Sequence, residues 1–134
     1  VVAYVGEYGG AVPYTAYNAK KSYIEKNQDL IKGFSKAIDK GLKFVKNNDA
    51  ETIANSIISF FPDTSLNDLI IMIDRYKEND AWRETIAINE EEWKHIQDIM
   101  IASGELNEYV PYDKLIYGKY FKEFEWYIDN QKSI

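Results

Sequence analysis

The stretch QDLIKGFSKAIDKGLKFVK, residues 28–46, carries the clearest structural signal in the sequence. Apolar side chains recur in it at steps of three and four residues, which places them on one stripe of an α-helix. The members of this stripe are Leu30, Ile31, Phe34, Ala37, Ile38, Gly41, Leu42 and Val45. Asn27 is placed to cap the start of this helix, and Asn47 with Asn48 suits its end. We therefore expect a mainly helical chain.

Further helices are predicted wherever a capping residue precedes an apolar periodic run. Asp49, Ser65 and Asn89 are the expected N-caps of three of them, and Asp68 and Glu92 complete capping-box patterns. The expected helices lie over about residues 18–26, between Asp49 and Pro62, over 66–77, from Asn89 to Gly104, and over 112–127.

Apolar and aromatic side chains on these helical stripes are expected to form the core, because buried aromatic residues dominate core energetics. The expected inward-facing residues include Phe34, Ile53, Ile57, Ile58, Phe61, Leu66, Leu69, Ile70, Ile73, Tyr76, Trp93, Ile96, Ile99, Met100, Tyr117, Phe121, Phe124 and Ile128. Trp82 follows a helix end, and the sequence leaves open whether it is buried or exposed.

The first 17 residues, VVAYVGEYGGAVPYTAY, break this helical pattern. Residues 1–8 are apolar on both alternating faces, as in a strand that is covered on both sides. Gly9 and Gly10 would form a turn, and residues 12–17 a second strand. Two strands alone are marginal in water, so we expect their partners in a longer protein of which this chain is a part. The chain also begins within the first predicted strand, without Met, which favours the same expectation.

The composition of the 134 residues argues against several classes of function. The chain has no cysteine, which excludes disulfides, thiolate zinc sites and cysteine nucleophiles. Its single histidine, His95, argues against a transition-metal site, and we interpret it as a surface residue of an acidic helix. A net charge of −6 with scattered basic residues argues against nucleic acid as a partner. No cofactor motif is complete, and no apolar run is long enough to span a bilayer.

One cluster in the opening stretch is a candidate ligand site. Tyr4, Glu7, Tyr8 and Tyr14 surround the Gly9–Gly10 turn at the end of a predicted strand. Strand ends and tight glycine turns are where α/β proteins place ligands, because backbone and polar side chains converge there. A carboxylate can accept hydrogen bonds from an amino group, and a tyrosine ring can stack on a ligand. The alternative interpretation is an ordinary Gly-Gly turn with aromatic cover.

Four segments in this order resemble the C-terminal part of an ABC-importer substrate-binding protein. They are VVAYVGEYGGAVPYTAYNAKKSYIEKN, DLIKGFSKAIDKGLKFV, DAETIANSI and NEEEWKHIQDIMIASGEL. The chain is most similar to the thiamine-pyrimidine-precursor-binding family (no-message-in-thiamine-like), which also contains binders of sulfonates and nitrate. It departs from that family at Gln28, where members often carry proline.

The resemblance implies a fold, a function and a location. It implies the C-terminal portion of a two-lobed α/β type II periplasmic-binding fold, with residues 1–17 as the interlobe segment, residues 18–134 as the helical portion, and the N-terminal region missing. The implied function is extracytoplasmic capture of a small heteroaromatic ligand, without catalysis or cofactor, for delivery to an ABC permease. Glu7 and Tyr8 would contact the ligand, with Tyr4, Gly9 and Tyr14 close by.

Two other classes of function remain open. Pyrimidine-precursor synthases share the fold of this family, but they depend on a reactive histidine and a cysteine-rich motif, and this chain has only His95 and no cysteine. A stand-alone helical interaction domain is the other alternative. Exposed strand edges pair readily, so the N-terminal strands would also allow a homodimer.

Overall fold

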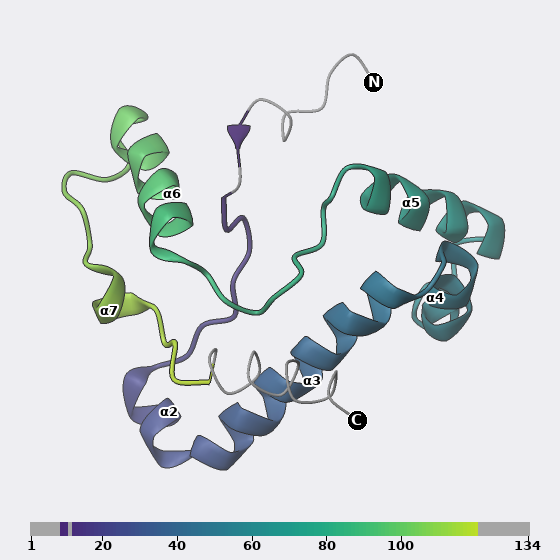
Figure 1. Cartoon of the computed structure of the whole chain (residues 1–134), viewed down its shortest axis with the longest axis horizontal. Coiled ribbons are helices and arrows are strands. Elements are labelled where there is room, and N and C mark those ends of the chain that lie inside the picture. Colours follow the sequence, from purple (N-terminus) through teal and green to yellow (C-terminus); the bar gives the residue numbers. More distant parts are fainter. Residues whose placement is uncertain (1–8, 11, 121–134) are drawn as a thin grey trace, which may run out of the picture. The chain divides into compact units, whose positions relative to one another are not determined.

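The computed structural model describes residues 9, 10 and 12–120, and it divides the chain into two compact units. The first unit comprises residues 1–29 and 87–134, and the second comprises residues 30–86. The described helices are α2 (Lys21–Lys26), α3 (Gln28–Asn47), α4 (Ala50–Ile57), the 3₁₀ helix η1 (Ile58–Phe60), α5 (Leu66–Glu78), α6 (Glu90–Ala102) and α7 (Tyr112–Leu115) (Figure 1). Helix α3 begins with the last two residues of the first unit's N-terminal segment and continues into the second unit.

The predicted α/β fold class is wrong for the part of the chain that the structure describes, because that part contains helices and no strand. Residues 12–17, predicted as the second strand, have no regular structure. The side chains of Tyr14 and Tyr17 there are 93% and 77% exposed. A strand is stabilised by hydrogen bonds to a neighbouring strand, and the described part of the chain contains no strand with which these residues could pair. The predicted strand over residues 1–8 lies outside the described residues.

The bounds predicted for the long helix are confirmed at α3. Its C-terminal end is closed as expected, because the side-chain amide of Asn48 donates a hydrogen bond to the carbonyl of Phe44 at 2.7 Å. The expected cap at the other end is wrong. The side-chain amide of Asn27 instead donates to the carbonyl of Tyr23 at 2.8 Å, and so closes α2.

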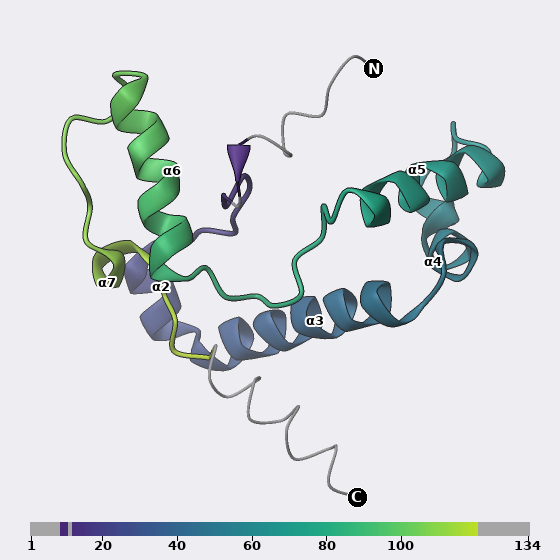
Figure 2. The same cartoon turned by 45° about the horizontal axis from the view of Figure 1, so that its top comes forward.

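The core of the second unit lies between α4 and α5, which Figures 1 and 2 show side by side. Its buried residues are Ala50, Ile53 and Ala54 from α4 and Leu69 and Ile73 from α5. Ala54 is fully buried, and its small side chain lets the two helices approach closely. The partly buried residues Val45, Ile57, Ile58, Ile70 and Trp82 pack against this core.

Three residues predicted to face this core lie outward. Phe61, Leu66 and Tyr76 are 41%, 38% and 52% exposed. The chain changes from α-helix to the 3₁₀ helix η1 after Ile57, and the tighter turn shifts the phase of the apolar stripe before Phe61. Leu66 and Tyr76 lie near the two ends of α5, away from the central contact at Ile73.

All three predicted N-caps are confirmed. The carboxylate of Asp49 accepts from the Thr52 backbone N–H at 2.8 Å, and Ser65 Oγ accepts from the Asp68 N–H at 3.1 Å. At α6 the capping box is complete, because Asn89 and Glu92 each accept from the other's backbone N–H, at 2.8 and 3.0 Å.

The helix predicted over residues 112–127 is much shorter than expected. Helix α7 ends at Leu115, and residues 116–120 are not helical. Their path is set by long-range contacts, because the hydroxyls of Tyr117 and Tyr120 donate to the side chain of Gln28 at 2.9 and 3.1 Å. Phe121, Phe124 and Ile128, predicted on this helix, lie outside the described residues.

The aromatic and apolar stripes of α3 and α6 are less buried than predicted. Phe34 on α3 is 43% exposed, and Ile99 and Met100 on α6 are 43% and 37% exposed. Within residues 9, 10 and 12–120, no helix combines the length and apolar character that crossing a membrane requires.

Candidate functional site

The sequence-predicted site lies only partly within the described chain. Tyr4, Glu7 and Tyr8 fall outside it, whereas Gly9 and Tyr14 fall inside. The ring of Tyr14 is almost wholly in solvent. The contact that the structure describes at Gly9 comes from a different residue, His95 of α6.

His95 bonds to the stretch that was predicted as a turn, 86 positions away in sequence. The structure corrects that prediction at Gly9, which it assigns as helical. The Nε2 atom of His95 lies 2.7 Å from the carbonyl oxygen of Gly9. A carbonyl oxygen only accepts, so Nε2 must carry the proton and donate it. The imidazole is half-buried, and its interpretation as a surface residue is therefore corrected.

Gly10 is held against the same imidazole. Its φ of +71° lies in the left-handed region, which glycine adopts without steric cost and other residues rarely adopt. A Cβ added to Gly10 would lie 3.1 Å from His95 Nε2, closer than most such contacts in proteins. The backbone conformation therefore favours glycine at this position, and a side chain there would also require the imidazole to shift by a few tenths of an ångström.

The helix that carries His95 is itself anchored by a polar network. Trp93 Nε1 donates to the carbonyl of Val110 at 2.9 Å, and the Val110 N–H donates to Gln97 Oε1 at 2.6 Å. Gln97 is only 3% exposed, and its Nε2 donates to the Trp93 carbonyl at 3.2 Å. The indole of Trp93 is half-buried, so it is a partly polar anchor and not the fully buried core residue expected.

Gln97 was missed by the sequence reasoning, although the sequence carries a signal for it. It lies four residues after Trp93 and therefore on the same helical face. A polar residue on an apolar face is expected to be buried with hydrogen-bond partners. His95 has no such signal in the sequence.

The outer face of α6 carries a charged cluster of Lys94, Asp98 and Tyr109. Lys94 Nζ pairs with Asp98 Oδ2 at 2.8 Å, and the Tyr109 hydroxyl donates to Asp98 Oδ1 at 2.5 Å. The hydrogen bond from Lys94 and then that from Tyr109 lower the pKa of Asp98. The same hydrogen bonds raise the pKa of Lys94 and of Tyr109. The pKa of Tyr112 is also raised, chiefly by burial.

A second polar cluster of the first unit centres on Gln28. Its Oε1 receives the hydroxyls of Tyr117 and Tyr120, and also Lys119 Nζ at 2.7 Å. Its Nε2 donates to the Ile24 carbonyl, so the side chain joins α2 to the segment after α7. Nothing in the local sequence around Gln28 predicts these partners.

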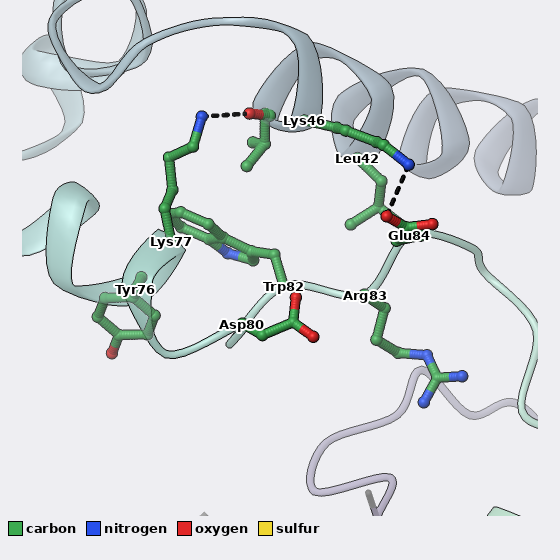
Figure 3. Close-up of a pocket in the computed structure, with 9 residues that line it drawn as sticks. Leu42, Lys46, Tyr76, Lys77, Asp80, Trp82, Arg83 and Glu84 are labelled. Carbon is green, nitrogen blue, oxygen red and sulfur yellow. Dashed lines mark hydrogen bonds and ion pairs between the residues drawn. The ribbon is translucent and has the colours of Figure 1, made fainter.

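The second unit contains a small groove of about 150 Å³ beside the α4–α5 core (Figure 3). It is lined by Leu42, Val45, Lys46, Tyr76, Lys77, Asp80, Trp82, Arg83 and Glu84. Figure 3 shows the Trp82 indole beside the Lys77 side chain, and the indole stacks on the Tyr76 ring with ring centroids 5.3 Å apart. The sequence left open whether Trp82 is buried. In the structure it is half-buried and packs against the core.

Three of the charged side chains that line this groove make contacts within the second unit. Lys46 Nζ pairs with Glu84 at 2.6 Å, and Lys77 Nζ donates to backbone carbonyls at the C-terminal end of α3. Cations at that end complement the helix dipole and satisfy carbonyls that lack helical partners. Among the described residues, no group of His, Asp and Glu side chains is arranged to hold a metal ion. The contacts of Lys77 therefore connect the C-terminal end of α3 to α5, and the Lys46–Glu84 pair connects α3 to the segment after α5.

Comparisons with known proteins give one informative match. No family model matches the chain, and no solved structure matches it significantly. The chain is 40% identical over 116 residues to a curated protein of Bacillus subtilis (strain 168) named "Putative binding protein YtlA". The match covers 87% of this chain but only 35% of the length of that relative. The chain therefore spans about a third of the length of a relative that is named as a binding protein.

Proposed function

We propose that this chain is one portion of the solute-binding component of an ABC importer. The complete protein captures a small heteroaromatic ligand, a pyrimidine precursor of thiamine, and delivers it to the permease. The observation that carries the binding role is the 40% identity to a binding protein over most of this chain. The ligand class and the importer come from the resemblance of the four segments quoted from the sequence.

In this proposal the opening stretch contributes the ligand contacts. The Glu7 carboxylate accepts hydrogen bonds from the amino group of the ligand, and Tyr8 stacks on its ring. Tyr4 and Tyr14 lie close by, and Gly9 provides backbone in the turn. The exposure of Tyr14 supports this role, because its ring is accessible to a ligand. Matching a charged, aromatic ligand with a carboxylate and aromatic rings is the usual chemistry of such sites.

The proposed protein binds and releases its ligand without chemical change and works outside the cytoplasm. The lack of cysteine in this chain supports a binding protein over a pyrimidine-precursor synthase, which depends on a cysteine-rich motif. Fractionation of cells that express the complete protein tests its location. Recovery in the cytoplasmic fraction alone would contradict the importer.

The binding proposal is tested by calorimetric titration of the complete protein with the aminopyrimidine precursor of thiamine. We expect tight binding by the wild type and at least a tenfold loss, about 1.4 kcal/mol, on Glu7→Gln. Glu25→Gln on the exposed side of α2 is the matched control, and it should leave the affinity unchanged. Parallel titrations with a sulfonate and with nitrate test the other ligands bound by this family.

Each outcome has a distinct meaning. Binding of the sulfonate or nitrate alone would retain the importer role and overturn the thiamine precursor as ligand. Equal loss of affinity in Glu7→Gln and Glu25→Gln would overturn the role of Glu7. Failure of the wild type to bind any of the three compounds would overturn the proposed solute class.

A further inference from the structure

The groove of the second unit is bordered by a residue with an unusual backbone conformation, Asp80. Among the described residues it is the one residue other than glycine with a positive φ, of +48°. The Asp80 N–H donates to the Lys77 carbonyl at 3.1 Å, and the Ala81 N–H donates to the Tyr76 carbonyl at 2.9 Å. These two hydrogen bonds form a Schellman motif, which fixes Asp80 directly after the C-terminal end of α5.

The stability of the helix does not explain an aspartate at this position. Glycine is the residue most often found there, because the left-handed conformation has a steric cost for residues that carry a Cβ. A carboxylate beside the C-terminal end of a helix is also repelled by the negative end of the helix dipole. Residues held in such conformations are concentrated at functional sites, so the Asp80 carboxylate is a candidate for ligand binding.

A second carboxylate and an aromatic ring line the same groove as Asp80. Glu84 is exposed, as Asp80 is, and its Oε1 lies 2.6 Å from Lys46 Nζ. A carboxylate can accept further hydrogen bonds beside such a pair. The Trp82 indole is held in place by its stacking on Tyr76. Two carboxylates and an aromatic ring around one groove are suited to an organic cation.

The cations that line the groove leave this preference in place. Lys46 is paired with Glu84, and Lys77 Nζ is bonded to carbonyls at the C-terminal end of α3. Figure 3 shows the Arg83 guanidinium directed away from the Trp82 indole. The chain as a whole has a net charge of −6, which favours association with a basic partner.

We infer that this groove binds an arginine side chain of a partner protein. A guanidinium is planar, packs on aromatic rings and pairs with carboxylates through several N–H groups at once. In the groove it packs against Trp82 and donates to Asp80, and the charge of Glu84 adds to the attraction. None of the residues proposed to contact the solute takes part, so this inference stands independently of the proposed function.

The size of the groove favours a side chain over a free small molecule. Its volume of about 150 Å³ is well below the roughly 300–1,000 Å³ of sites that enclose a small-molecule ligand. One side chain that protrudes from a partner needs less space, and arginine and tryptophan are among the residues that contribute most to protein–protein binding.

The test is an NMR titration of the complete protein, with isotopically labelled tryptophan, by the blocked peptide acetyl-Gly-Arg-Gly-amide. The indole N–H resonance of Trp82 is identified by its absence from Trp82→Phe. We expect this resonance to shift with a dissociation constant on the order of 1 mM at low ionic strength, because one side chain is only part of an interface. The same peptide with neutral citrulline in place of arginine should cause no shift, and added salt should weaken binding.

Two substitutions of Asp80 separate binding from folding. Asp80→Asn removes the charge and keeps a residue that tolerates the left-handed conformation, and it should weaken binding of the arginine peptide about threefold. Asp80→Gly should weaken binding as much and raise the midpoint of thermal unfolding, because glycine is preferred at this position. The matched control is Asp74→Asn, which makes the same change of charge at an exposed residue of α5 outside the groove and should leave binding unchanged.

The possible outcomes are distinct. Loss of affinity in both Asp80 variants, with Asp74→Asn at the wild-type value, would support the arginine site. Equal shifts with the citrulline peptide, or unchanged binding in Asp80→Asn, would overturn it. A lower unfolding midpoint in Asp80→Gly would show that Asp80 serves the fold. Tighter binding of free arginine than of the blocked peptide would overturn the partner protein as the source of the cation. None of these results bears on the solute that the complete protein is proposed to capture.

Discussion

Lys77 on α5 donates a hydrogen bond from Nζ to the carbonyl oxygen of Val45, at 3.2 Å, and another to the carbonyl of Asn48. Val45 and Asn48 lie at the C-terminal end of α3, where carbonyl groups have no partners within the helix. One ammonium group thus closes α3 and ties it to α5, 32 positions away in sequence.

Replacing this lysine should destabilise the second unit. We expect Lys77→Met to lower the free energy of unfolding by about 1–2 kcal/mol, because it leaves part-buried carbonyls without a donor. Lys46→Met is the matched control, since the Lys46–Glu84 pair is exposed and should contribute at most about 0.5 kcal/mol. Hydrogen exchange of α3–α5 peptides provides the measurement, and equal effects of the two variants would contradict the capping role.

The α4–α5 contact predicts that truncating two isoleucines of α5 has very different effects on the free energy of unfolding. Ile73 is 3% exposed in the core, whereas Ile71 is 43% exposed. Ile73→Ala should therefore cost about 2–5 kcal/mol, and Ile71→Ala less than about 1 kcal/mol. Urea unfolding of both variants compares them directly. A similar cost at the two positions would mean that α5 packs by a different face.

The capping box of α6 predicts a local loss of stability. Asn89→Ala removes the acceptor of the Glu92 N–H and should destabilise the helix by about 1 kcal/mol. Asn89→Asp keeps an acceptor and should remain close to the wild type. Exchange rates of the first-turn amides distinguish the two variants, and slow exchange in Asn89→Ala would show that the cap is dispensable.

The cluster of Lys94, Asp98 and Tyr109 predicts that the stability of the folded protein depends on pH. The pKa of Asp98 is lowered below its ordinary value of 3.8, first by the Lys94 hydrogen bond and then by that from Tyr109. A lowered pKa in the folded state adds stability above the unfolded pKa, and this stability is lost as the pH falls through the folded pKa. Carboxyl NMR titration should show a larger rise of the Asp98 pKa in Lys94→Met than in Tyr109→Phe. The reverse order would contradict the assignment of the larger effect to Lys94.

The pKa of Tyr109 is shifted in the opposite direction to that of Asp98. Its pKa is raised above 10.0, first by its hydrogen bond to Asp98, so the stability it adds is present below the unfolded pKa and is lost as the pH rises through the folded one. Asp98→Asn should lower the Tyr109 pKa toward 10.0 in an ultraviolet absorbance titration. An unchanged value would show that the hydrogen bond has no influence on the phenol.

The sequence predicted what depends on near neighbours. The caps at Asp49, Ser65 and Asn89 involve partners three residues away, so their residue types alone identify them. The core positions Ile53, Leu69 and Ile73 follow from helical periodicity. The apolar face of a helix can be recognised without knowing which other helix covers it. The strand predicted over residues 12–17 is wrong, because a strand also needs hydrogen bonds to a neighbouring strand, which a local apolar pattern does not specify.

What the tertiary structure alone decided is which distant groups meet. The donor to the Gly9 carbonyl comes from His95, two partners of Gln28 come from Tyr117 and Tyr120, and a second donor at the C-terminal end of α3, beside Asn48, comes from Lys77. Hydrogen bonds between groups tens of positions apart depend on how the chain is folded back, and residue type restricts them only to donors and acceptors. The sequence by itself therefore determined most of the described helices and the N-caps at Asp49, Ser65 and Asn89, whereas the contact of His95 with the Gly9 carbonyl was determined by packing.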